Sequence, residues 1–345
     1  MRIFIVIACL LFSTFSYANG NHRGNLLQRD FNSLGPTMKS FTSTITGRDI
    51  VYLDEGRENW QPVVFIGGSG TSGRVFALLE FLRTTRENLK LRFIAVERNG
   101  LGHTAFDNTL GFSDYAEDVE ELLAHLGVDR FSLFAISGGG PYSARIASRN
   151  PDRLISVHLA AALTFSDPTS SLCLAPPAAL SFFTENPMVW FGFAPDSPIH
   201  KISGFQDAAF DDAARTFNMG GQVADPAALH HEFQLYCGEQ ALPDLSLVTV
   251  PVFLYYGEED TTVPIDPHAI RWQEAYSSVE ATERFYPGEG HDVQYRHLDQ
   301  TLVDIAGMSD KIVVCRNGKS KLVNAGRVEK VLAKGASLGI CAWRN

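Results

Sequence analysis

The stretch FAISGGGPYS, residues 134–143, places a serine hydroxyl directly after an apolar run. Small residues flank Ser137, with Ala135 two positions before it and Gly139 two positions after. A sharp turn from a strand into a helix needs such residues because strand and helix approach closely there, and the turn holds the hydroxyl out at the sheet edge. The positive end of that helix and the N–H of Gly138 could stabilise negative charge. The pattern predicts a nucleophilic serine, and a serine that only caps a helix is the alternative.

Strand and helix patterns alternate along the chain and would position this serine. The continuous apolar runs predict mostly parallel strands buried on both faces. Between them, helical spacing predicts a helix with Ser113 as its cap and Gly127 as its stop, and another helix that begins near Gly140 and Pro141. We therefore expect an α/β fold with helices on both faces of the sheet. The predicted strands are Ile50–Leu53, Val63–Ile66, Leu91–Val96, Phe131–Ile136, Leu154–Leu159 and Val252–Tyr256.

From about Phe41 to Asp304 the chain resembles the α/β-hydrolase fold family. FAISGGGPYSARIASRNPDRL resembles that family's nucleophile elbow, YYGEEDTTVP its acid turn and YPGEGHDV its histidine loop. The resemblance implies Asp260 as the acid and His291 as the base that acts on Ser137. In such a triad the imidazole takes the serine proton, and the carboxylate fixes the tautomer of the imidazole and stabilises its charge. A serine at this position also distinguishes the chain from haloalkane dehalogenases and epoxide hydrolases, which use aspartate.

Several residues are alternatives to this acid and this base. Three carboxylates lie close to Asp260 in the sequence, and the chain has ten histidines. Histidines in helix or strand patterns suit a structural role, and the pair in the later insertion lacks metal-ligand spacing. We predict no metal site and no cofactor. The alternatives are Glu258, Glu259 and Asp266 for the acid, and His125, His158, His230 and His231 for the base.

VVFIGGSGTSG, residues 63–73, resembles the family's loop after its third strand, which commonly reads His-Gly-x-Pro. That register implies that the backbone N–H of Ser69 joins that of Gly138 in an oxyanion hole. Gly67 stands where the family has His and Gly70 where it has Pro. A phosphate-binding loop is the alternative, but no lysine follows as in a P-loop. A further stretch, ERNGLGHTAF, resembles a loop of the family that we interpret as structural.

Two segments interrupt the predicted hydrolase core of residues 36–165 and 245–305. Residues 166–244 are rich in Pro, Phe, Trp and Met and predict a cap insertion over the site, with apolar side chains that favour an acyl or aromatic substrate part. Packing within the cap itself is the alternative role for those side chains. Residues 310–345 contain an Asn-Gly turn between apolar runs, which predicts a small hairpin-bearing appendage. It resembles a short module at the ends of some bacterial exported proteins, with Arg316 in place of a histidine.

The start of the chain predicts export. Residues 1–18 combine a positive start, an apolar run and a small-x-small cleavage site, as in a secretory signal peptide. The apolar run is too short to span a bilayer, so we expect no stable membrane anchor and a periplasmic or extracellular protein. An even number of later cysteines then predicts two disulfides. Of the three possible pairings we prefer Cys173 with Cys237 and Cys315 with Cys341, because each pair then closes one segment.

Charge and composition restrict the partner. The 345 residues are 45% hydrophobic and carry a formal net charge of −10 with no run of Lys or Arg. Such a chain repels a nucleic-acid backbone or an anionic membrane surface. We therefore predict a small-molecule or short-peptide substrate and no nucleic-acid partner.

The sequence favours an exported serine hydrolase that cleaves a carboxylic ester with an apolar acyl or alcohol part through an acyl-enzyme on Ser137. The alternative on the same triad is an aminopeptidase or amidase similar to proline iminopeptidases, which needs carboxylates for a free amino terminus. A ligand-binding protein without turnover is a third possibility. The carboxylates available for the alternative are Glu185, Asp207, Asp211 and Glu232.

Overall fold

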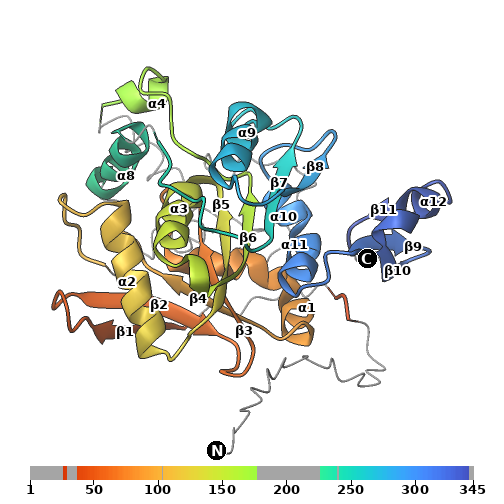
Figure 1. Ribbon diagram of the computed structural model, residues 1–345, viewed down its shortest axis with the longest axis horizontal. Coiled ribbons are helices and arrows are strands. Elements are labelled where there is room, and N and C mark those ends of the chain that lie inside the picture. Colours follow the sequence, from red (N-terminus) through yellow and green to blue (C-terminus); the bar gives the residue numbers. More distant parts are fainter. Residues whose placement is uncertain (1–25, 29–36, 103, 177–225, 239–240, 342–345) are drawn as a thin grey trace, which may run out of the picture.

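The computed structural model describes residues 26–28, 37–102, 104–176, 226–238 and 241–341. The predicted signal peptide and most of the predicted cap lie outside these residues. In the described part, eight strands form one large sheet and three form a small sheet at the carboxyl end of the chain (Figure 1). The strands of the large sheet are β1 (Met38–Thr42), β2 (Asp49–Glu55), β3 (Gln61–Ile66), β4 (Leu91–Val96), β5 (Phe131–Ile136), β6 (Leu154–Ala160), β7 (Val252–Gly257) and β8 (Thr282–Tyr286).

The spatial order of the large sheet is β1-β2-β4-β3-β5-β6-β7-β8. Strands β1 and β2 pair antiparallel, β2 pairs antiparallel with β4, and all further neighbours are parallel. Each of the six predicted strands lies within one of these strands, so the expectation of a mostly parallel α/β sheet is confirmed. Edge strands β1 and β8 were not predicted because most of their residues are exposed or half-buried, which leaves no continuous apolar run.

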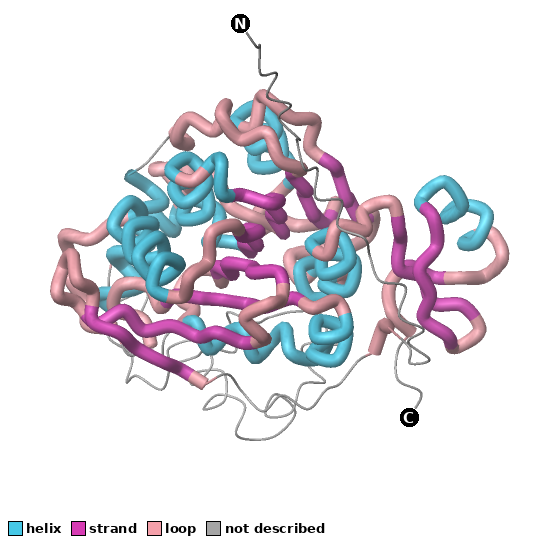
Figure 2. Tube along the Cα trace, turned by 60° about the horizontal axis from the view of Figure 1, so that its bottom comes forward, coloured by secondary structure: helices cyan, strands magenta, loops and turns pink. Residues whose placement is uncertain are grey.

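Helices cover both faces of the sheet (Figure 2). On β3, Val64 and Ile66 join one apolar cluster with α2, α3 and α9, while Val63 and Phe65 join a second cluster with η1 and α11. This alternation explains why the strands read as unbroken apolar runs. The helices are η1 (Gly73–Leu82), α1 (Arg83–Asn88), α2 (Phe112–His125), η2 (Ser137–Gly139), α3 (Gly140–Arg149), η3 (Pro151–Arg153), α4 (Ser171–Leu174), α8 (Pro226–Gly238), α9 (Ile265–Ala275), α10 (Val293–Arg296) and α11 (Leu298–Ile305).

Helix α2 begins two residues earlier than its predicted cap implies. Ser113 lies inside the helix, so its assignment as the cap was wrong. The N-cap is Gly111, whose backbone N–H donates to the Asp114 carboxylate at 2.8 Å. The Asp114 carboxylate thus accepts the N–H of the N-cap residue, whereas a serine hydroxyl at the N-cap would have accepted an N–H of the first helical turn. The predicted stop is confirmed, since Gly127 follows the helix with a φ of 65°.

The small sheet has the order β10-β9-β11. Strands β9 (Lys311–Arg316) and β10 (Lys319–Asn324) form the predicted hairpin, in which Asn317 and Gly318 both have positive φ. A tight hairpin turn favours that conformation, which Asn-Gly adopts readily. Strand β11 (Ser337–Leu338) adds a third strand, preceded by η5 (Ala325–Arg327) and α12 (Val328–Leu332).

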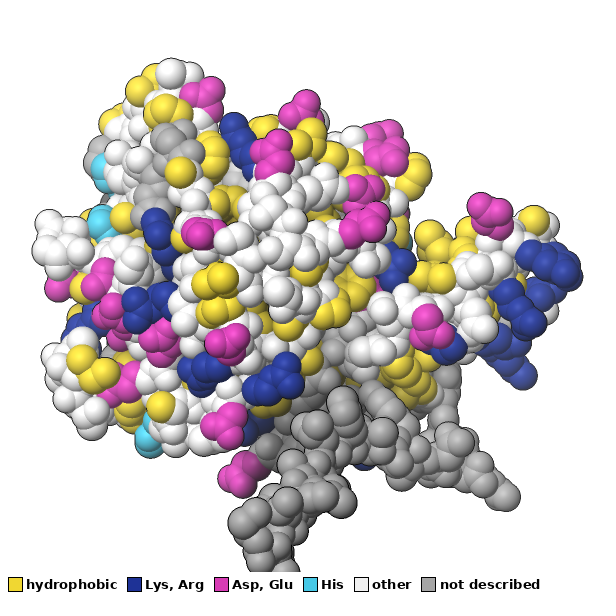
Figure 3. Space-filling model, viewed as in Figure 1, with side chains coloured by type: hydrophobic (Ala, Val, Ile, Leu, Met, Phe, Trp, Pro, Cys, Tyr) yellow, Lys and Arg dark blue, Asp and Glu magenta, His cyan; other side chains and the backbone are white. Residues whose placement is uncertain are grey.

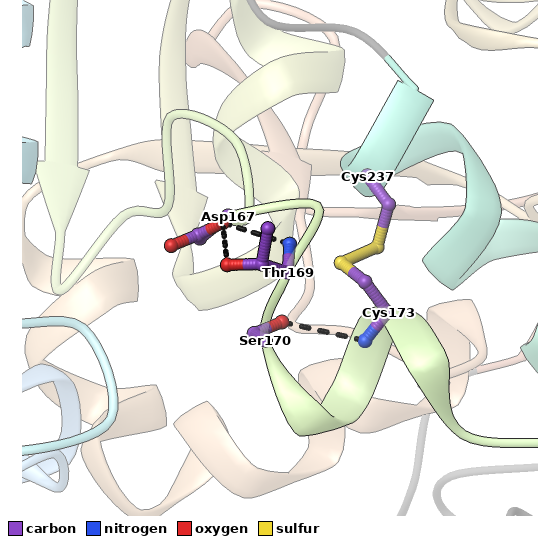
Figure 4. Close-up of a disulfide and its surroundings, with 5 residues drawn as sticks. All are labelled: Asp167, Thr169, Ser170, Cys173 and Cys237. Atoms are coloured by element: carbon purple, nitrogen blue, oxygen red, sulfur yellow. Dashed lines mark hydrogen bonds between the residues drawn. A yellow bond between two sulfur atoms is a disulfide. The ribbon is translucent and has the colours of Figure 1, made fainter.

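Two disulfides close the segments that the cysteine pattern predicts. Cys173 in α4 bonds to Cys237 near the end of α8 (Figure 4). Cys315 in β9 bonds to Cys341 after β11. The preferred pairing is therefore confirmed. Among the described residues, no helix has both the length and the apolar character that crossing a bilayer requires.

Candidate active site

Ser137 lies in the sharp turn between β5 and α3, with a φ of 49° that side chains rarely adopt. Its carbonyl accepts the N–H of Leu163 at 2.8 Å, which helps to hold this conformation. A Cβ on Gly139 would lie 2.6 Å from the carbonyl oxygen of Ile66 and 2.9 Å from that of Gly67. Only glycine fits there, so the turn has the close packing that the small residues around the serine predict.

The structure brings together the three side chains that the resemblance implies. His291 Nε2 lies 3.1 Å from Ser137 Oγ, and His291 Nδ1 lies 2.8 Å from Asp260 Oδ2. The other carboxylate oxygen, Asp260 Oδ1, accepts the N–H groups of Thr262 and Val263 at 2.8 and 2.9 Å. The Asp260 side chain is fully buried and that of His291 is about one-fifth exposed. The arrangement can pass a proton from the hydroxyl to the imidazole while the carboxylate stabilises the resulting charge.

The alternative acids and bases lie elsewhere. Glu258, Glu259 and Asp266 are exposed, whereas Asp260 is buried against His291. Asp260 follows β7 and His291 follows β8, and these parallel neighbours bring both residues to the same edge of the sheet.

Three of the four histidines named as alternative bases, His125, His158 and His231, make structural contacts. Both ring nitrogens of His158 are hydrogen-bonded, to Ser156 at 2.8 Å and to Tyr255 at 2.9 Å, and burial lowers the pKa of His158 to about 3. His125 stacks on Phe41. The ring of His231 hydrogen-bonds to a backbone carbonyl of residue 110. Within the described residues, no group of three His, Cys, Asp or Glu side chains could hold a metal ion.

The loop after β3 passes directly beside the serine. A Cβ on Gly68 would lie 3.2 Å from the Cβ of Ser137. A Cβ on Gly138 would lie 2.9 Å from the backbone nitrogen of Ser69 and 2.7 Å from the hydroxyl of Tyr236. The backbones of the two residues named for the oxyanion hole are thus adjacent, next to Ser137.

Arg98 fixes the loop after β3 through hydrogen bonds, a role that the sequence analysis did not predict. Its guanidinium donates to the carbonyls of Gly67 at 2.8 Å and Thr71 at 3.0 Å, and also to the carbonyl of Gly68. The side chain is buried and forms an ion pair with Glu232, whose carboxylate lies 3.1 Å away. One arginine therefore fixes three carbonyls of a glycine-rich loop that has little rigidity of its own.

Helix α8, from the predicted cap segment, contacts both halves of this site. The Glu232 carboxylate accepts the N–H of Gly70 at 2.6 Å, and the Tyr236 hydroxyl donates to the carbonyl of Gly138 at 2.9 Å. The two side chains are four residues apart and share one face of the helix. Burial, and secondly the charge of Glu232, raise the pKa of Tyr236 well above its usual value, so the hydroxyl keeps its proton. The predicted disulfide of Cys237 indicated that the segment around Tyr236 is fixed to a second segment. The sequence does not indicate that this segment contacts the turn at Gly138.

The remaining cap residues named from the sequence lie outside the described residues. They comprise the apolar residues of the predicted underside and three of the four carboxylates considered for an amino terminus, Glu185, Asp207 and Asp211.

This chain belongs to the Alpha/beta hydrolase family, and the sequence model of that family matches residues 63–304. It is 29% identical over 115 residues to a protein of Leptolyngbya boryana named Probable proline iminopeptidase, an overlap that covers 32% of this chain and 34% of that protein. The chain thus matches only about a third of that relative's length. It is 22% identical over 277 residues to the non-heme chloroperoxidase of Burkholderia pyrrocinia, covering 77% of this chain and 97% of the relative.

Solved structures share the fold at low sequence identity. A hydrolase from Pseudomonas aeruginosa has a TM-score of 0.60 at 17% identity, covering 79% of this chain and 98% of that one. The enol-lactonase of Burkholderia xenovorans has a TM-score of 0.60 at 16% identity, with 78% and 100% covered. A thermophilic esterase from Thermogutta terrifontis has a TM-score of 0.56 at 16% identity, with 79% and 97% covered. These likenesses show the α/β-hydrolase fold.

Proposed function

We propose that this protein is a serine hydrolase that cleaves a carboxylic ester with an apolar acyl or alcohol part. The observation that carries the proposal is the continuous chain of contacts from Ser137 Oγ to His291 at 3.1 Å and from His291 to Asp260 at 2.8 Å. A serine hydroxyl is a poor nucleophile until a neighbouring imidazole can take its proton. The positive φ of Ser137 supports the same role, because strained backbone at a turn often occurs at functional sites.

In the proposed reaction, Ser137 Oγ attacks the ester carbonyl carbon and its proton passes to His291 Nε2. The carbonyl oxygen becomes negative and is stabilised by the backbone N–H groups of Gly138 and Ser69. The bond to the alcohol then breaks, and the alcohol leaves with the proton from His291. Water repeats the sequence on the acyl-enzyme, releases the carboxylic acid and restores the serine. Asp260 holds the imidazole in place throughout.

An aminopeptidase or amidase of proline iminopeptidase type is the second candidate, supported by the partial similarity to the Leptolyngbya boryana protein. One of its four candidate carboxylates is already engaged, because Glu232 pairs with Arg98 and accepts the N–H of Gly70. A substrate ammonium group at Glu232 would have to compete with a buried arginine. This competition favours the ester over the amino-terminal substrate.

A fluorophosphonate probe followed by peptide mass spectrometry tests the proposal. We expect an adduct on Ser137 in the purified protein and none in Ser137→Ala. Panels of acyl esters and aminoacyl amides then separate the two candidates, with turnover expected on the esters. A folded protein that takes up no probe, tried also with detergent present, and turns over neither panel would refute hydrolysis and favour the binding protein.

We also propose export through cleavage of residues 1–18, with a hydrolase core, a cap and an appendage at the boundaries given above. Two disulfides support an oxidising compartment, where such bonds persist. Expression of the full chain in a bacterium with a secretion pathway, followed by amino-terminal sequencing, tests the proposal. A first residue at Asn19 is expected, and an uncleaved cytosolic chain would contradict it.

A further inference from the structure

The charge of the chain is unevenly distributed. Residues 310–341 contain seven Lys and Arg but only two Asp and Glu, so this segment carries +5 within a chain of −10. The rest of the chain is correspondingly more acidic than the total suggests. Asymmetry of this kind between parts of one chain indicates an interaction with a charged partner.

Five basic side chains of this segment are exposed and form what we call the basic face. In the described part of the chain, none of the five has an acidic side chain within ion-pair distance, and the ion pair of this segment joins Lys311 to Asp310. Figure 3 shows Lys and Arg side chains gathered on the outer end of the appendage, away from the main body. The basic face comprises Lys319, Lys321, Arg327, Lys330 and Lys334.

The residues of the basic face lie on or next to two elements, β10 and α12. Lys319 and Lys321 alternate along β10, which is an edge strand of the small sheet, so they point to the same side. Lys330 lies in α12, with Arg327 at the N-cap of this helix and Lys334 in the turn that follows it, so the three residues are close together in the chain.

The appendage is held against the main body at a fixed position. Gln300 of α11 donates to the carbonyl of Lys311 at 3.0 Å and accepts the N–H of Val313 at 2.9 Å. Asp299 of the same helix accepts the N–H of Ile340 at 2.5 Å. Val313 and Ile340 are buried in the same apolar cluster as α11. The basic face is therefore presented in one direction, as Figure 1 shows for the protruding small sheet.

We propose that the basic face adsorbs the protein reversibly to an anionic phospholipid bilayer. At physiological ionic strength, exposed charges act over about 8 Å, so a protruding basic face can attract an anionic surface although the whole chain is acidic. The acidic body is repelled by the same surface, which orients the molecule with its appendage toward the lipid. The net charge of the chain led us to expect repulsion from an anionic membrane surface. Under this proposal that repulsion applies to the main body and not to the appendage.

Two features favour lipid over nucleic acid as the anionic partner. Residues 310–341, the described part of the appendage, contain no aromatic residue and no histidine on which bases could stack, and Trp343 lies outside the described residues. Five of the seven basic residues are lysines, which act as point charges toward headgroups without the bidentate geometry of arginine. Leu338, 39% exposed on the same small sheet, adds an apolar contact.

Vesicle co-sedimentation tests this proposal with the full chain. The protein is mixed with vesicles of phosphatidylglycerol or of phosphatidylcholine, at low salt and at 0.5 M NaCl. We expect binding to the anionic vesicles only, with at least about tenfold weaker binding at high salt. K319E/K321E should weaken binding by about tenfold or more, since each cation near an anionic surface contributes severalfold.

The matched control is R57E/K90E, which makes the same change in net charge at two exposed residues of the main body that form no ion pair within the described residues. It should bind nearly as well as the unchanged protein. Equal loss in both variants would show that only net charge matters and would overturn the basic face. Tighter binding to duplex DNA than to anionic vesicles at equal phosphate, or salt-sensitive self-association in place of vesicle binding, would overturn the lipid assignment. Esterase activity is not needed for this test, so its outcome is independent of the proposed function.

Discussion

At the residue scale, Ser137 is positioned by a backbone angle as much as by its side-chain contacts. A φ of 49° in a residue other than glycine costs of order 1–3 kcal/mol and persists only where the surroundings impose it. Here the surroundings are the strand before the turn, the helix after it and the glycine loop beside it. The small residues next to the serine are therefore part of the site.

Gly138→Ala tests how closely the two proposed oxyanion donors are packed. The new methyl would lie 2.9 Å from the nitrogen of Ser69 and 2.7 Å from Tyr236 Oη, so one of the backbones has to move. Because an oxyanion donor is worth about 10²-fold or more in rate, kcat on an ester should fall by about that factor. Steady-state kinetics on the ester that Ser137 hydrolyses best provide the measurement.

Gly326→Ala is the control for this change, because nothing lies within 4 Å of its added Cβ. Its kcat should equal that of the unchanged protein. If Gly138→Ala kept full activity with a native thermal transition, the oxyanion assignment would be wrong.

At the element scale, α8 joins the cap segment to the chemistry. Glu232 and Tyr236 reach from one helix to the two backbone segments that meet beside Ser137. A disulfide fixes the end of the same helix to α4. The position of α8 therefore controls the geometry of the loop, and a cap that shifted would disturb the proposed oxyanion hole.

Tyr236→Phe removes the hydroxyl that donates to the carbonyl of Gly138 and leaves the ring in place. We expect kcat to fall about fivefold while KM changes little, since a single hydrogen bond is worth about 1 kcal/mol and this one orients a donor without touching substrate. Tyr276→Phe is a matched control, because the Tyr276 hydroxyl is buried without a hydrogen-bond partner in the described structure. A drop in thermal stability with unchanged kcat would assign Tyr236 a purely structural role.

Removing the disulfide between α4 and α8 also tests whether the position of α8 affects turnover at Ser137. The bond closes a loop with a sequence separation of 64, so C173A/C237A should destabilise the segment by about 4 kcal/mol. The temperature at which ester turnover is lost should fall with it. C315A/C341A, which opens the appendage instead, should leave turnover at 25 °C unchanged. Equal loss of turnover in both variants would contradict a specific role for α8.

At the scale of the whole molecule, His158 makes the fold sensitive to acid. Burial lowers its pKa from 6.5 to about 3, so the folded protein keeps the ring neutral where the unfolded chain binds a proton. Above pH 6.5 the ring is neutral in both states and contributes no pH dependence. As the pH falls from 6.5 toward 3, the free energy of unfolding should decrease by about 1.4 kcal/mol per pH unit from this group alone.

His158→Gln should reduce that slope between pH 6 and pH 4, measured by urea unfolding at each pH. Part of the slope should remain, because burial first, and then the charge of Arg271, lowers the pKa of His268 to about 4. An unchanged slope in the variant would mean that His158 does not stay neutral in the folded protein.

The sequence alone determined the type of sheet, the six inner strands, the hairpin and the disulfide pairing, and its resemblance to the α/β-hydrolase family implied Asp260 and His291 as partners of Ser137. These features have local signals: continuous apolar runs for strands buried on both faces, small residues at a tight turn, and an Asn-Gly pair at a hairpin. The edge strands were missed because exposed strands lack an apolar run, and the cap of α2 was misassigned because a glycine without a capping side chain occupies the N-cap.

Only the tertiary structure decided which side chains hold the loop beside Ser137. Glu232 lies 162 residues from the Gly70 whose N–H it accepts, and Arg98 lies 31 residues from the Gly67 carbonyl to which it donates. Parallel strands bring the loops after β3, β5, β7 and β8 to one edge of the sheet, and α8 then packs against two of them. Such contacts leave no periodic trace in the sequence, because each depends on where a distant segment packs. The same holds for the basic face, whose charges the sequence contains but whose outward direction follows from the docking of the appendage on α11.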